Sequence, residues 1–152
     1  MNKTKPNVWM EQKIRNTIPL SEFMGFSIVN LQVDLIETYA PFDVNLNIHG
    51  TGFAGSIYSL GVLTGWALCS YNMHILGMDG DLVVGDAQIR YRSAITDDIE
   101  CFSSISQSEL AVFNNEFIEK GKSKLCLDIV IGSAKNAILS ASYYAVLKEG
   151  EN

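Results

Sequence analysis

The chain has 152 residues, a formal net charge of -6 at pH 7 and a pI near 4.8. Proteins that track nucleic-acid phosphates concentrate Lys and Arg, so this acidic composition argues against that class and no nucleic-acid partner is expected. Hydrophobic residues make up 47% and charged residues 18% of the chain. These values predict one folded domain over residues 1–152 that buries part of its surface in a homodimer or higher homo-oligomer.

The cysteines and the apolar segments indicate a cytoplasmic protein. Cys69, Cys101 and Cys126 have no metal-site spacing and are expected to be reduced core residues, so no metal is predicted. Residues 1–16 contain no apolar signal sequence. The longest apolar run, residues 57–68, is shorter than the roughly 20 residues that span a bilayer, so no membrane partner is expected.

The N-terminal part of the chain predicts one helix followed by a hairpin. Apolar residues recur at helical spacing over residues 8–18, and Pro19 ends that helix. Residues 26–31 and 33–40 are rich in β-branched and aromatic side chains, which favour strands. Pro41 stops the second strand and opens a long loop.

Residues 56–73 are apolar on nearly every side and therefore predict a buried helix, with Ser56 as its N-cap residue. Gly61 and Gly65 lie four residues apart on one face of this helix. Because glycine lowers helix stability, we expect the pair to let a sheet approach closely. Trp66 is assigned to the core or to a pocket wall.

Four further strands complete the predicted architecture. Polar and apolar residues alternate with the period of half-buried strands at residues 82–92, 99–106, 125–131 and 137–147. Residues 108–122 form either a short helix or an irregular excursion. This order of elements gives an α+β protein with an antiparallel sheet. A sheet wrapped around one long buried helix is the hotdog fold.

The loop before the buried helix contains two misleading patterns. Residues 50–55 read G-x-G-x-x-G, but residues 41–49 separate them from the preceding strand and no βαβ order follows, so dinucleotide binding is not expected. Ser56 lacks the G-x-S-x-G context of a hydrolase nucleophile. The glycines instead bring backbone N–H groups to a helix N-terminus, where they form either an oxyanion hole or only a tight turn into the helix.

Four stretches of sequence carry a family resemblance. Residues 45–59 read NLNIHGTGFAGSIYS and residues 63–66 read LTGW, while IPxSEFM occupies residues 18–24 and DGDxVVxDAxIRY residues 79–91. Together they resemble a bacterial hotdog family of thioesterase-like proteins that also occurs as the C-terminal half of a fused acetyltransferase-like protein. The resemblance implies an enzyme that acts on the thioester of an acyl group carried by coenzyme A or acyl carrier protein, without a resident cofactor.

The wider hotdog thioesterases carry the pattern N-x-x-G-T-x-H-G-G, to which residues 47–55 are similar. Carried over by position, Asn47 touches the thioester and the Gly55 N–H binds its oxygen. Phe53 stands where the wider pattern has His, and Val62 stands where its helix presents a catalytic Asp. Members of the narrower family are linked to decarboxylation of malonyl carrier-protein thioesters, and the resemblance also implies that reaction.

The site predicted from the loop and this resemblance has two groups of residues. The expected catalytic residues are Asn47, His49, Thr51, Gly55 and Ser56. The expected substrate-binding residues are Asn45, Phe53, Ala54, Tyr58 and Arg90. Tyr58 is equally a candidate for the core. Arg90 and its neighbour Arg92 either hold a phosphate of coenzyme A or an acidic carrier protein, or form a solvated strand face.

Three functions remain open from the sequence: a thioester hydrolase, a malonyl-thioester decarboxylase and a non-catalytic acyl-carrier binding module. A hydrolase needs a general base for water, for which His49, Asp43 and Asp86 are the candidates. A decarboxylase needs only donors that stabilise an enolate oxygen. A binding module needs a pocket and shows no turnover.

Overall fold

The structure is a computed structural model that describes residues 4–149. Its elements in chain order are α1 (Pro6–Thr17), α2 (Leu20–Phe23), β1 (Ser27–Leu31), β2 (Leu35–Ala40), α3 (Ala54–Ile75), β3 (Gly80–Tyr91), β4 (Ile99–Ser104), α4 (Gln107–Lys120), β5 (Lys122–Ile131) and β6 (Ala137–Leu147). Residues 1–3 and 150–152, the two ends of the predicted domain, lie outside the described part. No helix within residues 4–149 is both long and apolar enough to cross a bilayer.

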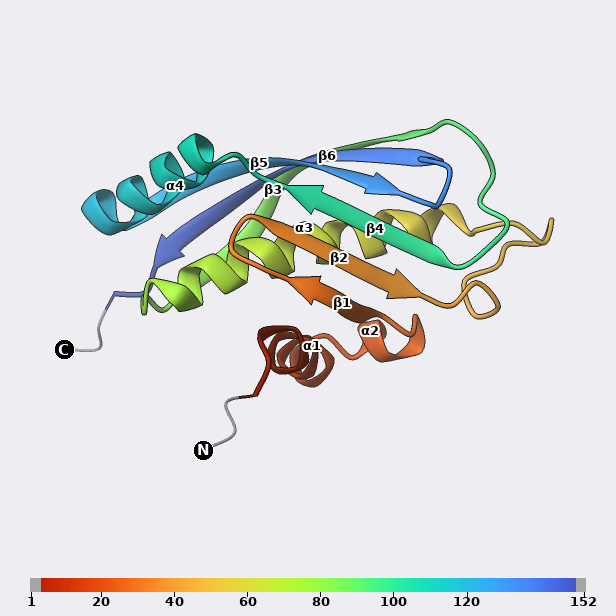
Figure 1. The fold of residues 1–152 in the computed structure, drawn as a ribbon, viewed down its shortest axis with the longest axis horizontal. Helices are drawn as coiled ribbons and strands as arrows, with labels where there is room; N and C mark the ends of the chain where they lie inside the picture. The colour runs from red at the N-terminus through yellow and green to blue at the C-terminus, as the bar shows by residue number, and fades with distance from the viewer. Residues whose placement is uncertain (1–3, 150–152) are drawn as a thin grey trace.

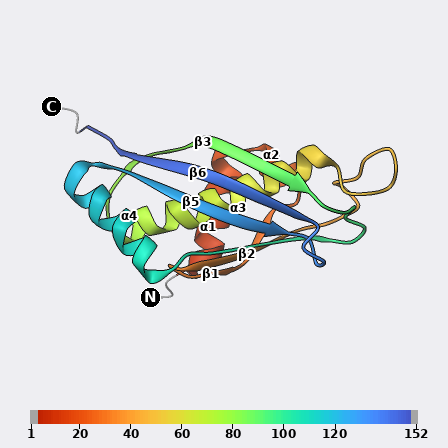
Figure 2. The same ribbon diagram turned by 90° about the horizontal axis from the view of Figure 1, so that it is seen from above.

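The six strands form one antiparallel sheet in the order β1-β2-β4-β5-β6-β3. The sheet curls around α3, while α1 and α2 lie beside β1 and α4 lies at the opposite end of the sheet (Figures 1 and 2). Five strands, β2 to β6, pack against α3. The predicted α+β hotdog architecture is therefore confirmed.

Side-chain alternation explains why the sheet buries one face against α3. Every second residue of β5 is buried, including Leu125, Leu127 and Ile129, and β6 follows the same pattern. Successive side chains of a strand point to opposite faces, so these apolar residues all meet the helix. The side chains between them, such as Lys124 and Asp128, remain exposed on the outer face.

The glycine pair of α3 faces the sheet, as predicted. A Cβ atom added to Gly61 would lie 2.8 Å from Ile131 Cδ1, and one added to Gly65 would overlap the Tyr143 hydroxyl. That hydroxyl donates a 2.8 Å hydrogen bond to the Val62 carbonyl. The missing side chains thus allow a fully buried tyrosine to pack directly against the helix backbone.

The start of α3 differs from the prediction. The helix begins at Ala54, two residues early, and its N-cap residue is Phe53, which offers no side-chain hydrogen bond. The prediction that Ser56 caps the helix is wrong, because Ser56 is the third residue of the first turn. A cap without a polar side chain leaves the first N–H groups of the helix without a side-chain acceptor.

Three other local features were open, missed or wrong. Residues 108–122 are mostly helical, because α4 begins with a reciprocal capping box between Ser106 and Glu109 and ends at Gly121 in the left-handed region. The four-residue α2 was not predicted. The prediction that Cys126 is a core residue is wrong, because it is exposed on the outer face of β5. Cys69 and Cys101 are buried as predicted, and all three thiols are free.

The strand β3 forms one edge of the sheet and contains an irregularity. Its pairing with β6 shifts between Val84 and Asp86, which is the signature of a β-bulge. Leu82 and Val84 are half-buried before the shift, and Ala87 and Ile89 after it. The alternation predicted for the second half of this strand is confirmed, while the bulge was not foreseen.

The glycine contact yields a stability prediction. Replacing Gly65 with Leu should lower the free energy of unfolding by about 1–3 kcal/mol, because the added atoms overpack a site already filled by Tyr143. Chemical denaturation measures the change. The matched control is Ser59→Ala, on a half-buried flank of the same helix, which should keep the wild-type midpoint. Equal stability of the Leu variant and the wild type would show that the helix face is not packed this closely.

Candidate functional site

The loop from residue 41 to 53 is fastened to its surroundings by the buried Asn45. This side chain is 2% exposed, and its Nδ2 donates to the carbonyls of Met24 at 2.9 Å and Pro41 at 2.8 Å. Its backbone carbonyl accepts the Phe53 N–H at 2.8 Å. Asn45 therefore ties the end of α2 to the residue that precedes α3. The structure gives it a supporting position rather than one that is open to a substrate.

Asn47 organises the tip of the same loop. Its Oδ1 accepts the N–H groups of His49 at 2.9 Å and Thr51 at 3.1 Å, and its Nδ2 donates to Thr51 Oγ1 at 2.8 Å and to the Gly52 carbonyl at 3.3 Å. An amide has two donor hydrogens and one acceptor oxygen, and all are engaged here. In this arrangement the Asn47 amide shapes the loop and has no free donor for a thioester oxygen. The Thr51 hydroxyl accepts from Asn47 and keeps its own hydrogen available to donate.

Asp98 anchors the beginning of the loop. Its carboxylate accepts the Phe42 N–H at 2.9 Å and the Tyr39 hydroxyl at 2.8 Å. The bond from Phe42, followed by that from Tyr39, lowers the pKa of Asp98 below its ordinary value. The same contact raises the pKa of Tyr39. An ionised carboxylate thus holds the loop across the physiological range, and its stabilising effect is lost only as the pH falls through the lowered pKa.

The N-terminus of α3 presents unpaired backbone donors. The N–H groups of Ala54, Gly55 and Ser56 have no hydrogen-bond acceptor within residues 4–149, and the first intrahelical bond runs from Ile57 to Phe53 at 3.0 Å. The helix dipole adds a partial positive charge at this end. The three donors form an anion-binding surface of the kind that stabilises a developing oxyanion.

Aromatic side chains surround these donors. Phe53 is 51% exposed, and its Cε1 lies only 2.7 Å from the position that a Cβ of Gly55 would take. The Tyr91 hydroxyl at the end of β3 donates a 2.8 Å hydrogen bond to the Ala54 carbonyl. Burial, and then the neighbouring Tyr58, raises the pKa of Tyr91, so this hydroxyl stays protonated and serves as a donor. Sequence reasoning placed Tyr91 on the apolar face of its strand and missed this contact.

The structure brings some predicted site residues together and separates others. Ala54, Gly55, Ser56, Phe53 and Tyr58 gather at the first turn of α3. His49 lies at the exposed tip of the loop. Arg90 alternates with Tyr91, which reaches α3, and therefore lies on the opposite, outer face of β3.

No hydrogen bond within residues 4–149 joins the side chain of a candidate base, His49, Asp43 or Asp86, to the first turn of α3. His49 and Asp43 lie exposed in the loop, and Asp86 is exposed on β3. Asp86 and Arg90 both follow the bulge and are four positions apart in the strand. Because side chains alternate between faces, Asp86 shares the outer face of the sheet with Arg90. No Asp, Glu or His occurs on α3 before His74. The first turns of α3 thus carry no general base of their own.

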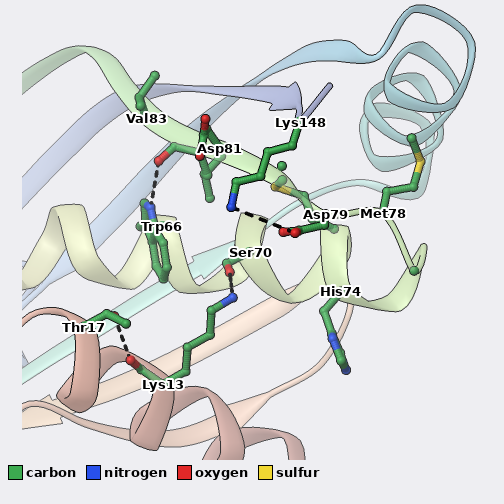
Figure 3. Close-up of a pocket in the computed structure, with 14 residues that line it drawn as sticks. Lys13, Thr17, Trp66, Ser70, His74, Met78, Asp79, Asp81, Val83 and Lys148 are labelled. Carbon is green, nitrogen blue, oxygen red and sulfur yellow. Dashed lines mark hydrogen bonds and ion pairs between the residues drawn. The ribbon is translucent and has the colours of Figure 1, made fainter. Parts of the chain in front are cut away.

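A cavity lies further along α3 than the predicted site. Its volume is about 820 Å³, and it opens between α1, the C-terminal half of α3 and the first half of β3 (Figure 3). Trp66 forms one wall, and its indole N–H donates to the Leu82 carbonyl at 3.1 Å. Lys13 and Ser70 line the floor. Apart from Trp66, sequence reasoning did not single out these residues, because they are spread over three elements.

The fold and the helix-terminal donors define a protein of the hotdog class. The sequence profile of the family described as "Putative thioesterase (yiiD_Cterm)" matches residues 8–147, and the chain belongs to this family. A crystal structure described as a "putative thioesterase" from Shewanella oneidensis is 31% identical with a TM-score of 0.83, and the match covers 93% of this chain and 97% of that one.

Two further solved structures share the fold at lower identity. A protein described as having unknown function from Chlorobaculum tepidum is 23% identical with a TM-score of 0.88, over 93% of this chain and 94% of that chain. A thioesterase from Haemophilus influenzae is 15% identical with a TM-score of 0.72, over 99% and 97% of the two chains. The same architecture thus persists through extensive sequence change.

The crowding of Phe53 over Gly55 yields a prediction for the site. In Gly55→Ala the new methyl group and the displaced ring cover the free N–H groups, so acyl-thioester turnover should fall by about 10²–10³ in kcat. Because the ring is half-exposed and free to swing, thermal stability should change little. Steady-state kinetics and a melting curve test this, with Ser104→Ala as the control, because Ser104 is exposed on β4. Undiminished turnover would show that the N–H groups of this turn do not take part.

Proposed function

We propose that the chain binds an acyl thioester of coenzyme A or acyl carrier protein, with the thioester oxygen at the N–H groups of Gly55 and Ser56. The observation that carries this proposal is the set of unpaired donors at the N-terminus of α3. These donors are fixed before the substrate arrives, so little reorganisation is needed when negative charge develops on the oxygen. Membership of a thioesterase family makes hydrolysis the first reaction to consider.

Hydrolysis at this site would be slow in a single chain. A thioesterase activates water with a general base, which typically contributes 10²–10⁴ in rate. Val62 occupies the position at which the wider hotdog pattern has Asp, and His49, Asp43 and Asp86 lie away from the donors. We therefore expect weak hydrolysis in which Tyr91 positions the helix terminus and no protein carboxylate takes the proton from water.

Decarboxylation of a malonyl thioester is the second candidate, favoured by the absence of a base on the first turns of α3. The bond between the methylene carbon and the carboxylate breaks, CO₂ leaves, and the electron pair forms an enolate whose oxygen the N–H donors hold. Water then supplies a proton to the methylene carbon, which gives an acetyl thioester. The apolar ring of Phe53 beside the site disfavours a charged carboxylate and so favours its loss.

A homodimer through β3 is part of the proposal. The other sheet edge, β1, is covered by α1, because the Ile28 N–H donates to Glu11 Oε2 at 2.9 Å and Asn7 Nδ2 donates to the Ile28 carbonyl at 3.3 Å. On β3 the indole N–H of Trp66 donates to one carbonyl, that of Leu82. Beyond the bulge β3 pairs with β6 on one side, and no strand of residues 4–149 pairs with its other side. A free edge of this kind pairs readily with a second copy.

The deciding experiment is a panel of acyl-CoA, malonyl-CoA and the corresponding carrier-protein thioesters, with free thiol and CO₂ followed separately. Thiol release from simple acyl thioesters identifies a hydrolase, and CO₂ release without thiol release identifies a decarboxylase. Binding without either product identifies an acyl-carrier binding module and removes the catalytic proposal.

The variant Val62→Asp tests the role of the missing base. Val62 is half-buried on the open flank of α3, so a carboxylate there is expected to be tolerated. Its introduction should raise thiol release from acyl thioesters by at least tenfold, toward the contribution of a general base, and leave CO₂ release from malonyl thioesters unimproved. Val62→Asn is the matched control without a charge. An unchanged hydrolysis rate would show that a base is not what limits this reaction.

The dimer has a separate test. Light scattering at micromolar concentration should give twice the mass of the chain. The variant Gln88→Pro, which removes a backbone donor in the second half of the edge strand β3, should shift the mass toward the monomer or abolish folding. Ser140→Pro on the interior strand β6 serves as the control that damages the sheet itself. A monomeric wild-type chain would contradict the dimer.

A further inference from the structure

The cavity between α1, α3 and β3 contains an ammonium group without a counter-ion. Lys13 Nζ donates to Ser70 Oγ at 3.3 Å and lies over two indole rings, 5.4 Å from the centroid of Trp9 and 5.8 Å from that of Trp66. No carboxylate oxygen of residues 4–149 lies within 4.0 Å of it. Figure 3 shows the Lys13 side chain running along the cavity to Ser70.

The surroundings of Lys13 make it a site for an anion rather than a structural ion pair. The faces of indole rings orient an ammonium group and partly replace its water, but they leave its remaining hydrogens unpaired. The other lysine in the cavity, Lys148, is already 3.9 Å from Asp79. Asp81 lines the same cavity from β3, so the free positive charge is localised at the α1 side.

The position of Ser70 along α3 indicates which part of a thioester ligand reaches Lys13. Ser70 follows Gly55 by 15 residues, which at about 1.5 Å per residue places it about 22 Å from the donors at the helix N-terminus. A malonyl carboxylate is separated from its thioester carbon by a single methylene and cannot span this distance. The phosphate at the far end of an extended phosphopantetheine arm lies at a distance of this order from the thioester.

The flank of α3 between the two points is open to such an arm. Ser59, Val62 and Trp66 are half-buried, whereas the residues on the sheet side of the helix, such as Leu60 and Ala67, are buried. The half-buried positions recur at helical spacing and form one strip that runs from the N-terminus of α3 to the cavity. A mixed polar and apolar strip suits the amides and methylenes of a pantetheine chain.

We propose that Lys13, with Ser70 and the indole of Trp66, binds the phosphate of the phosphopantetheine arm while the arm lies along α3 toward Gly55. This inference rests on the proposed thioester function and adds the recognition of its carrier. Coenzyme A and acyl carrier protein share this phosphate, so the site accepts both in principle. Lys13 is then a binding residue that acts on ligand affinity and not on the chemical step.

The test is calorimetric binding of phosphopantetheine and of pantetheine, which lacks the phosphate, to the intact chain. The wild type should bind phosphopantetheine about tenfold or more tightly, as expected for a charge-assisted hydrogen bond. Lys13→Gln should remove this preference, and Lys13→Arg should retain most of it. Lys124→Gln is the matched control, because Lys124 also lies over an aromatic ring, 5.5 Å from the centroid of Tyr144, but outside the cavity. Equal affinity of the wild type for both compounds would overturn the proposal.

Two further measurements distinguish the carriers and separate this inference from the catalytic one. The first compares the affinities of the wild type and of Lys13→Gln for coenzyme A and for a phosphopantetheinylated carrier protein. The ligand that the variant binds more weakly is the carrier that the site recognises. If the variant binds both ligands as tightly as the wild type, the proposal is overturned. If thioesters are turned over, Lys13→Gln should raise KM with kcat unchanged. A chain that shows the phosphate preference but no turnover keeps this site and loses the catalytic proposal.

Discussion

The close packing of α3 against the sheet is the constraint on which the rest of the molecule depends. A helix that is apolar on nearly every side is stable only when it is covered, and here five strands cover it. The glycines at 61 and 65 remove the side chains that would hold the sheet away, and the Tyr143 hydroxyl takes the space and bonds to the Val62 carbonyl. Burial raises the pKa of Tyr143, so this hydroxyl remains a donor. The helix is thereby fixed along its axis as well as across it.

A helix fixed in this way gives its N-terminus a defined place, and the loop before it completes the arrangement. Asn45 and Asp98 fasten the loop at its beginning and middle, and the Tyr91 hydroxyl holds the first helical carbonyl. The Asn45 Nδ2, the Asp98 carboxylate and the Tyr91 hydroxyl are engaged in holding the backbone, whereas Asn45 Oδ1 is buried without a partner. The free donors at this end include the backbone N–H groups of the first turn of α3. A cap residue with a polar side chain would have satisfied one of them. The choice of Phe53 leaves them available and brings an apolar ring beside them.

The sequence predicted the fold well because the fold follows from local patterns. Local sequence patterns placed all six strands and the helices α1 and α3, whereas the segment of α4 was left open. The two glycines indicated the face of α3 that meets the sheet. The bulge in β3 depends on cross-strand register, and the capping box of α4 was overlooked although Ser106 and Glu109 show it. The site was harder. Asn47 was predicted to touch the thioester because its position matches a family pattern. Its amide instead makes four local hydrogen bonds, which the sequence does not show. Lys13 of α1 meets Ser70 and Trp66 of α3, and the three share no motif.

The two proposals together assign complementary chemistry to the N-terminal turn of α3 and to the region of Ser70. The N-terminal end combines a positive backbone potential with aromatic walls, which suits a carbonyl oxygen that gains charge during reaction. The region near Ser70 offers a full positive charge that stays constant, which suits a group that is anionic throughout. A group that is always anionic and an oxygen that becomes anionic only during reaction need different binding partners. A fixed cation beside the reacting carbonyl would stabilise a substrate carboxylate as well as an enolate. In the proposed binding mode about 22 Å of helix separates the two, so that binding energy from the remote phosphate positions the thioester without stabilising its ground state at the reacting atoms.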